Sequence, residues 1–207
     1  DYVGCPRRFL LRYIRRVAWP AVESEPFLEH ERHLALGTAF HRLVWQHLSG
    51  VDGERLSRAA GREPELKRWW QAYLAHAPAA LPGRLHPEVT LAAPLAGYRL
   101  IAKYDLLALD RAGEAVILDW KTGVHRPADG TLRARMQTLV YRYLLVQAGT
   151  DLNSAPIEPD RVRMIYWFPE HPDRPAGLPY GRDRYIADHA YLDGLVRRIA
   201  SLGDREF

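Results

Sequence analysis

The chain contains 207 residues, of which 47% are hydrophobic and 26% are charged, ordinary proportions for a soluble globular protein. Its net charge of +4 permits a phosphate-bearing partner without requiring one. The single cysteine, Cys5, excludes a disulfide within the chain and favours a cytoplasmic protein. No apolar run approaches the length of a membrane span.

The length fits one domain over residues 1–207 with a substantial core. Within it, we expect residues 1–85 to be mainly helical and residues 86–207 to contain a sheet. The chain begins at Asp1 without Met and stops abruptly at Phe207, so we expect residues to be missing at both ends.

Residues 6–18 are predicted to form a helix with Pro6 in its first turn. Its apolar stripe comprises Phe9, Leu10, Tyr13, Ile14 and Val17. Another face carries arginines at a spacing of four, which either follow a phosphate backbone or form an ordinary solvated face. These arginines are Arg8, Arg12 and Arg16. Segment 19–30 holds two prolines and three glutamates and is predicted to be a loop.

A second helix is predicted over residues 32–48. Its predicted core positions are Leu36, Phe40, Leu43 and Val44. His41 lies beside this stripe and should be partly buried and face inward, where a histidine is more often a core residue than a ligand. Gly37 weakens a helix by about 1 kcal/mol relative to Ala, which indicates that another backbone approaches closely there.

Further helix is predicted over residues 54–77, followed by a proline-rich loop and a short strand over 88–91. The apolar residues of this helix are interpreted as packing residues and not as a base-stacking platform. They are Leu66, Trp69, Trp70, Tyr73 and Leu74.

The centre of the chain is predicted to be a hairpin of strands 97–109 and 115–121, with Gly113 in the tight turn. If Asp110 pairs with Glu114, the register places Asp105 opposite Asp119. Opposed carboxylates repel each other, and a divalent cation between them explains the arrangement most simply. Strand alternation puts Lys121 on the face of Asp119, a constellation typical of metal hydrolases. The alternative is a surface hairpin whose charges are simply solvated.

After this hairpin come a polar loop to residue 130, a helix over 132–147, a strand over 162–168, a loop over 169–182 and a helix over 187–202. On the first of these helices, Gln137 and Tyr141 share one face, with Arg133 and Arg135 near its entrance. The element order predicts an α/β or α+β fold, a small mixed β-sheet covered by helices.

Several short motifs resemble the PD-(D/E)XK nuclease superfamily. They are Cys5-Pro6, Gly37 to His41, Asp105, Asp119-Trp120-Lys121, and Gln137 to Tyr141. Their order over about residues 2–145 is similar to that of the RecB-like branch, which includes CRISPR-associated RecB-like exonucleases and the nuclease domains of helicase–nuclease complexes. The resemblance implies one restriction-endonuclease-like nuclease domain with an N-terminal helical portion.

The resemblance also implies roles for individual residues. The expected ligands of Mg²⁺ or Mn²⁺ are His41, Asp105, Asp119 and the backbone carbonyl of Trp120, with Glu88 as a candidate outer-shell acid. Lys121 would orient the attacking water, and Gln137 and Tyr141 would position Lys121 or the scissile phosphate. Candidate DNA-binding residues are Arg8, Arg12, Arg16, Arg126, Arg133 and Arg135.

The chain departs from the branch at two points. Ala102 stands where a glycine often precedes the first acid. Some members hold a [4Fe–4S] cluster with an early cysteine and a C-terminal trio, but Cys5 is alone here, and one thiolate cannot hold a cluster. A cluster would require further cysteines beyond residue 207.

The expected function is that of a metal-dependent DNA nuclease, an exonuclease preferring single strands or ends, with a helicase or a CRISPR-adaptation protein as a candidate partner. The alternatives are a catalytically silent DNA-binding or scaffold module and a metal hydrolase of small phosphoesters. No Gly-x-x-x-x-Gly-Lys-Ser/Thr motif is present, so no nucleotide cofactor and no helicase motor are expected.

Overall fold

The computed structural model describes residues 2–17, 25–153 and 155–203. The helices are α1 (Pro6–Phe9), continued by a π-helical turn (Leu10–Ile14), α2 (Glu25–Leu48), α3 (Gly53–Ala60), α4 (Pro64–His76), α5 (Asp129–Ala134), α6 (Met136–Ala148), α7 (Thr150–Asn153) and α8 (Arg182–Ser201), with a 3₁₀ turn at Pro159–Arg161. The strands are β1 (Arg84–Pro87), β2 (Thr90–Leu95), β3 (Tyr98–Lys103), β4 (Leu106–Leu109), β5 (Ala115–Trp120), β6 (Val162–Trp167) and β7 (Ala176–Pro179). Within these ranges, no helix is long and apolar enough to cross a membrane.

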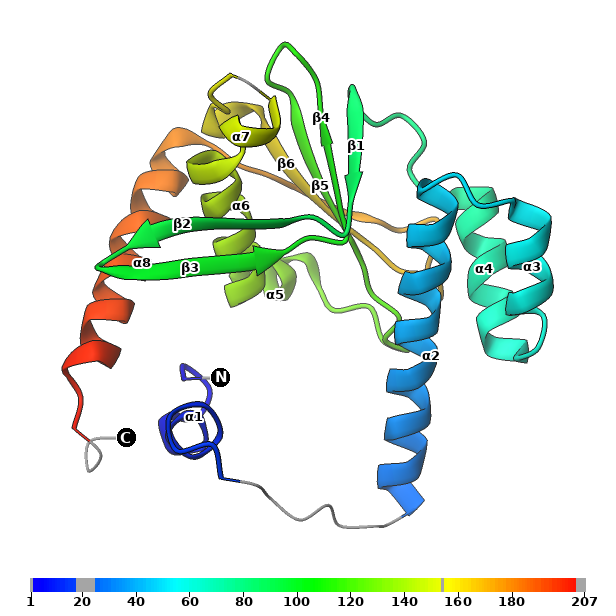
Figure 1. Ribbon diagram of the computed structural model, residues 1–207, viewed down its shortest axis with the longest axis horizontal. Coiled ribbons are helices and arrows are strands. Elements are labelled where there is room, and N and C mark those ends of the chain that lie inside the picture. The colour runs from blue at the N-terminus through cyan, green and yellow to red at the C-terminus, as the bar shows by residue number, and fades with distance from the viewer. Residues whose placement is uncertain (1, 18–24, 154, 204–207) are drawn as a thin grey trace.

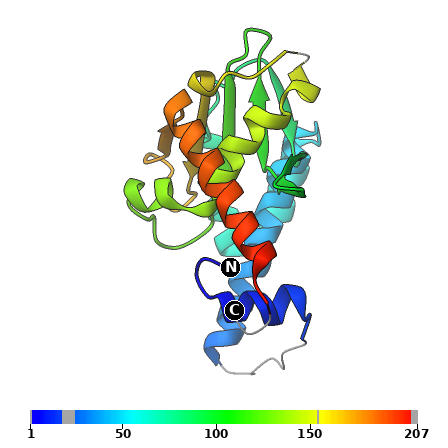
Figure 2. The same ribbon diagram turned by 90° about the vertical axis from the view of Figure 1, so that its left-hand side faces the viewer.

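The described strands form a five-stranded sheet in the order β1-β4-β5-β6-β7 and a separate two-stranded sheet of β2 and β3. The larger sheet is mixed, because β5 and β6 run parallel while its other pairs are antiparallel. Helices α2 to α4 lie on one side of it and α5 and α6 on the other, and α8 runs outside α6 (Figures 1 and 2). The predicted restriction-endonuclease-like α+β fold is therefore confirmed.

The central hairpin has the predicted register. Leu106 pairs with Leu118 and Leu109 with Ala115, and the Asp110 N–H donates to the Glu114 carbonyl at 3.1 Å. Gly113 has a φ of 89°, the left-handed conformation that the turn requires. Extended by one residue, this register puts Asp105 opposite Asp119.

The two faces of β5 enter two different cores, as strand alternation predicts. Val116, Leu118 and Trp120 pack with α2 to α4, whereas Ala115 and Ile117 pack with α5 and α6. Both faces of the strand are buried. The end of β5 is thereby fixed between two helical layers.

The predicted strand 97–109 is wrong as a single strand, because it divides at Tyr104 and Asp105 into β3 and β4, which belong to different sheets. Of the predicted strand 88–91, only residues 90 and 91 are in a strand, where they begin β2, whereas Glu88 and Val89 form the corner after β1. Pairing nevertheless continues across the corner, since the Glu88 N–H donates to the Asp105 carbonyl at 2.9 Å and the Tyr104 N–H to the Val89 carbonyl at 2.8 Å. Glu88 adopts a left-handed φ of 55°, which turns the chain out of the larger sheet.

Several helix boundaries also differ from the prediction. The helix predicted over 54–77 is broken before Pro64, whose ring occupies the first turn of α4, and the helix over 132–147 is divided at Arg135. Helix α2 already begins at Glu25, so the predicted loop 19–30 is wrong from that residue on, and residues 18–24 lie outside the described ranges. The N-terminal helix stops at Ile14, α8 begins at Arg182, and β7 lies within the predicted loop 169–182.

Two predicted apolar surfaces are only partly buried. Leu74 is 50% exposed, whereas the other four packing residues of that helix are buried. In the N-terminal segment Leu10 is buried, but Tyr13, Ile14 and Val17 are each about half exposed. The apolar pattern therefore overestimates the core at both places.

Glu170, in the turn that follows β6, connects α4 to the sheet through hydrogen bonds. Its Oε1 accepts hydrogen bonds from Trp69 Nε1 and Arg68 Nη2, both at 2.7 Å. Burial alone would raise the pKa of Glu170, but these two hydrogen bonds outweigh it and hold the pKa below its usual value.

We predict that Glu170→Ala lowers the free energy of unfolding by about 1–2 kcal/mol, because it leaves the buried Trp69 N–H unpaired. Glu170→Gln keeps an acceptor for this N–H and should lose less. Because the folded-state pKa is depressed, the carboxylate's contribution is present at neutral pH and disappears as the pH falls through that pKa. Urea unfolding of the wild type and of the two Glu170 variants at pH 7 and pH 4 measures this pH-dependent loss of stability. An equal loss for the Ala variant at both pH values would contradict it.

Candidate active site

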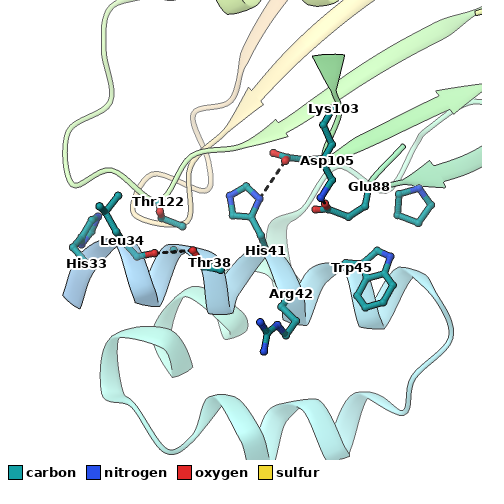
Figure 3. A pocket seen from close by; sticks show the side chains of 12 residues that line it. His33, Leu34, Thr38, His41, Arg42, Trp45, Glu88, Lys103, Asp105 and Thr122 are labelled. Atoms are coloured by element: carbon teal, nitrogen blue, oxygen red, sulfur yellow. Dashed lines mark hydrogen bonds and ion pairs between the residues drawn. The ribbon is translucent and has the colours of Figure 1, made fainter. Parts of the chain in front are cut away.

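A cavity of about 800 Å³ opens between α2 and the corner where β1 ends and β4 begins. Its lining includes His41 from α2, Glu88 and Asp105 from the corner, Lys103 from β3, and Thr122 after β5. Figure 3 shows these side chains converging on the same region. Segments far apart in the chain therefore meet here.

His41 is positioned by the packing of α2 against the sheet. Its neighbours Phe40 and Val44 are buried in the core, which leaves the imidazole, 29% exposed, at the mouth of the cavity. His41 Nδ1 lies 3.2 Å from Asp105 Oδ1. Burial alone would lower the pKa of His41, but its hydrogen bond to Asp105 and the charge of Asp105 outweigh burial and raise it.

Asp105 lies where two strand pairings meet. Its backbone carbonyl accepts from the Glu88 N–H, and its Oδ2 accepts from the Trp120 N–H at 2.9 Å. Its other carboxylate oxygen faces His41. The carboxylate is therefore held by the end of β5 and by α2 at once.

Glu88 completes a set of three candidate ligands. His41, Glu88 and Asp105 each offer one ligand atom, and these atoms all lie within 4.8 Å of one another. The Glu88 carboxylate also forms an ion pair with Lys103. The left-handed backbone at Glu88, which costs a non-glycine residue about 1–2 kcal/mol, aims this side chain. The residue expected in an outer shell thus lies within 4.8 Å of the candidate ligand atoms of His41 and Asp105.

Asp119 lies deeper and is 2% exposed. Its Oδ1 accepts from Gln137 Nε2 at 2.6 Å, and its Oδ2 lies 2.5 Å from Lys121 Nζ. This ion pair leaves Oδ2 without an aligned hydrogen bond. Burial raises the pKa of Asp119 to about 6, although the charge of Lys121 opposes the shift. Asp119 Oδ2 is thus buried in an ion pair with Lys121, and Asp119 is not among the residues that line the cavity.

Comparison with known proteins identifies the family. A model of the PD-(D/E)XK nuclease superfamily matches residues 1–205. The chain belongs to the PD-(D/E)XK nuclease superfamily. Members of this superfamily use divalent metal ions. No curated protein matches the chain.

Two solved structures resemble this superfamily member more distantly. A "Putative exonuclease" from Eubacterium rectale is 11% identical, with 88% of this chain and 68% of that chain covered and a TM-score of 0.45. A protein named SSO0001 is 12% identical, with 79% and 74% covered and a TM-score of 0.34. Both TM-scores are below 0.5, so neither likeness adds to the family assignment.

The other predicted site residues of this PD-(D/E)XK chain lie in different surroundings. Gln137 contacts Asp119 and not Lys121, while the Tyr141 hydroxyl donates to the Lys103 carbonyl at 2.6 Å and braces the corner. Lys121 Nζ lies 5.6 Å from the centre of the Tyr166 ring, which forms a wall beneath it. The side chain of Trp120 packs in the core with Tyr73 and Trp167. The backbone N–H of Trp120 donates a hydrogen bond to the Asp105 carboxylate.

None of the six candidate DNA-binding arginines is among the cavity-lining residues. The guanidinium of Arg126 is 13% exposed and is occupied by the carbonyls of Pro127 and Arg174 and the carboxylate of Asp129. Arg8, Arg12, Arg16 and Arg133 are exposed, and Arg135 is half-buried. A role of these arginines in DNA binding remains a prediction.

Cys5 acts as the N-cap of α1. Its Sγ accepts a hydrogen bond from the Arg8 N–H at 3.4 Å. This contact gives the lone cysteine a structural role that needs no iron–sulfur cluster.

Several cavity residues lie outside the sequence motifs, among them Lys103 and Trp45. The sequence analysis made no prediction for Lys103, although it is one of three lysines and precedes Asp105 by two residues. Trp45 gave no comparable signal, because its place in the cavity depends on how α2 approaches the sheet.

Gly37 allows α2 to approach the segment after Lys121. A Cβ at Gly37 would lie 2.8 Å from Thr122 Oγ1, so the close neighbour is a side chain and not the backbone that the sequence predicted. Adding that Cβ would force the Thr122 side chain to move.

We predict that Gly37→Ala lowers the thermal midpoint in the wild-type background but raises it in a Thr122→Ala background. Alanine favours a helix by about 1 kcal/mol over glycine, and removing Thr122 Oγ1 removes the clash that cancels this gain. Thermal unfolding of the two single variants and the double variant, compared with wild type, measures the coupling. The same shift in both backgrounds would show that the contact is not limiting.

Proposed function

We propose that this chain is a metal-dependent deoxyribonuclease of the RecB-like branch, an exonuclease that hydrolyses phosphodiester bonds in single strands or at DNA ends. The observation that carries the proposal is the convergence of His41, Asp105, Asp119 and Lys121 at the end of one hairpin. The family assignment supports a nuclease, and the order of the RecB-like motifs supports the branch.

The donor set fits a hard divalent cation. Carboxylate oxygens of Glu88 and Asp105 with one imidazole suit Mg²⁺ and, through the nitrogen, Mn²⁺. Asp119 Oδ2, buried and without an aligned donor, is the next candidate ligand, together with the carbonyl of Trp120. A bound ion would polarise the phosphodiester and lower the pKa of a coordinated water.

The chain's own residues organise the reaction around that centre. Lys121, held by Asp119 and the Tyr166 ring, places an ammonium group where negative charge develops on the phosphorus oxygens. Gln137 fixes Asp119 through its second oxygen, so the orientation of Lys121 depends on α6. The Trp120 N–H fixes Asp105 in the same way.

The scaffold alternative is disfavoured because the acids and the lysine are all present, with Asp119 paired to Lys121 and Asp105 to His41. Hydrolysis of a small phosphoester is tested by competition with single-stranded DNA. A cytoplasmic location, which the single cysteine favours, and a helicase or CRISPR-adaptation protein as partner stay our proposals.

We predict that Lys121→Ala slows Mn²⁺-dependent cleavage of a labelled oligonucleotide by about a hundredfold or more, as the loss of a transition-state donor typically does. Lys67→Ala is the matched control, because Lys67 is exposed on α4 and is not among the cavity-lining residues. EDTA should abolish cleavage by the wild type. Wild-type rates for Lys121→Ala would refute the proposed mechanism.

We predict that Glu88→Gly weakens Mn²⁺ binding about tenfold or more while the thermal midpoint of the metal-free protein holds or rises. Glycine removes a ligand but relieves the left-handed backbone at this position. Ala96→Gly is the control, because Ala96 has a φ of 50° in the turn between β2 and β3, away from the three candidate ligands. Calorimetric titration and thermal unfolding separate the two effects, and unchanged Mn²⁺ affinity for Glu88→Gly would exclude it as a ligand.

A further inference from the structure

One side of α2 presents a stripe of exposed residues to the cavity. Its members are Leu34, Thr38, Arg42 and Trp45. They follow one another at helical spacing beside His41, and Figure 3 shows them along the same helix. The stripe is therefore continuous with the candidate metal centre but belongs to none of the contacts described for it.

Trp45 is the unusual member of this stripe. It is 42% exposed, whereas Trp69, Trp70, Trp120 and Trp167 are all buried in the core. The indole thus leaves a large part of its apolar ring exposed at the cavity wall. An exposed aromatic ring beside a nuclease site offers a face on which a base can stack.

Arg42 gives the same stripe a positive charge. Other basic residues of α2 are neutralised by the segment between α3 and α4 and by α4 itself, since Arg32 pairs with Glu63 and His33 with Glu65. Arg42 forms no ion pair with any acidic side chain among the described residues, and it is exposed. Its guanidinium is available to a phosphate.

The distance along α2 between His41 and Trp45 is comparable with the length of one nucleotide. Trp45 follows His41 by four residues, which is about 6 Å along the helix axis. Arg42 lies between them in sequence. A cavity of about 800 Å³ also has the size of pockets that hold small organic ligands.

We propose that Trp45 stacks on an unpaired base of the DNA substrate while Arg42 contacts a neighbouring phosphate, so that this face of α2 selects single-stranded DNA. This inference rests on the proposed nuclease function, and it names Trp45 as the residue that determines which class of DNA the nuclease takes. Bases within a duplex are already stacked on one another, so only an unpaired nucleotide can present its face to Trp45.

The test measures binding separately from cleavage. Fluorescence anisotropy in EDTA gives the affinity of the full chain for a labelled single strand, for the same strand with abasic sites, and for a blunt duplex. The variants are Trp45→Ala and Trp45→Phe, with Tyr191→Ala as a matched control because Tyr191 is 45% exposed on α8. Circular dichroism verifies that each variant is folded.

We expect Trp45→Ala to bind the single strand about tenfold more weakly, the loss of one stacked base, and Trp45→Phe to retain most of the affinity. The Trp45→Ala defect should vanish on the abasic strand and be absent on the duplex, and Tyr191→Ala should bind as the wild type does. Equal losses of affinity for the single strand, the abasic strand and the duplex would overturn the proposal. So would unchanged binding of the single strand by Trp45→Ala, or failure of the wild type to bind the single strand. Wild type that binds but cleaves no DNA with Mn²⁺ would instead count against the proposed function alone.

Discussion

The site depends on the corner at Asp105, where one antiparallel pairing passes from the larger sheet into the two-stranded sheet. The Asp105 carbonyl is bound to Glu88, one carboxylate oxygen to the Trp120 N–H, and the other faces His41. Three segments of the chain are thus fixed by one residue. Because Glu88 must take a left-handed backbone to make this corner, the fold accepts local strain where the candidate ligands converge.

The burial of Asp119 adds an electrostatic cost to the backbone strain at Glu88. Asp119 is buried between two helical layers, and burial raises its pKa to about 6 even though Lys121 lies beside it. Lys121 and Gln137 stabilise this carboxylate, and a further cation beside it would favour its charged form. The two cores that clamp β5 prevent Asp119 from turning to solvent to avoid this cost. Rigid packing thus holds the Asp119–Lys121 ion pair in place at the end of β5.

The hairpin was predictable from sequence because Gly113 and the pair Asp110 and Glu114 determine the register locally. The division of the strand at Asp105 was not, since apolar residues continue on both sides of it and the change of sheet depends on the Glu88 backbone. His41 and Lys121 were found through spacing and motif. The closeness of Glu88 and the exposure of Trp45 and Leu74 follow from how α2 and α4 approach the sheet, which apolar periodicity does not encode.

The central claim is that this corner holds a divalent cation. X-ray diffraction at the manganese absorption edge from Mn²⁺-soaked crystals tests it most directly. The account predicts an anomalous peak in the cavity, within about 2.0–2.6 Å of ligand atoms from His41, Glu88 and Asp105. No peak there at saturating Mn²⁺, or a peak bound only by residues elsewhere on the surface, would contradict it.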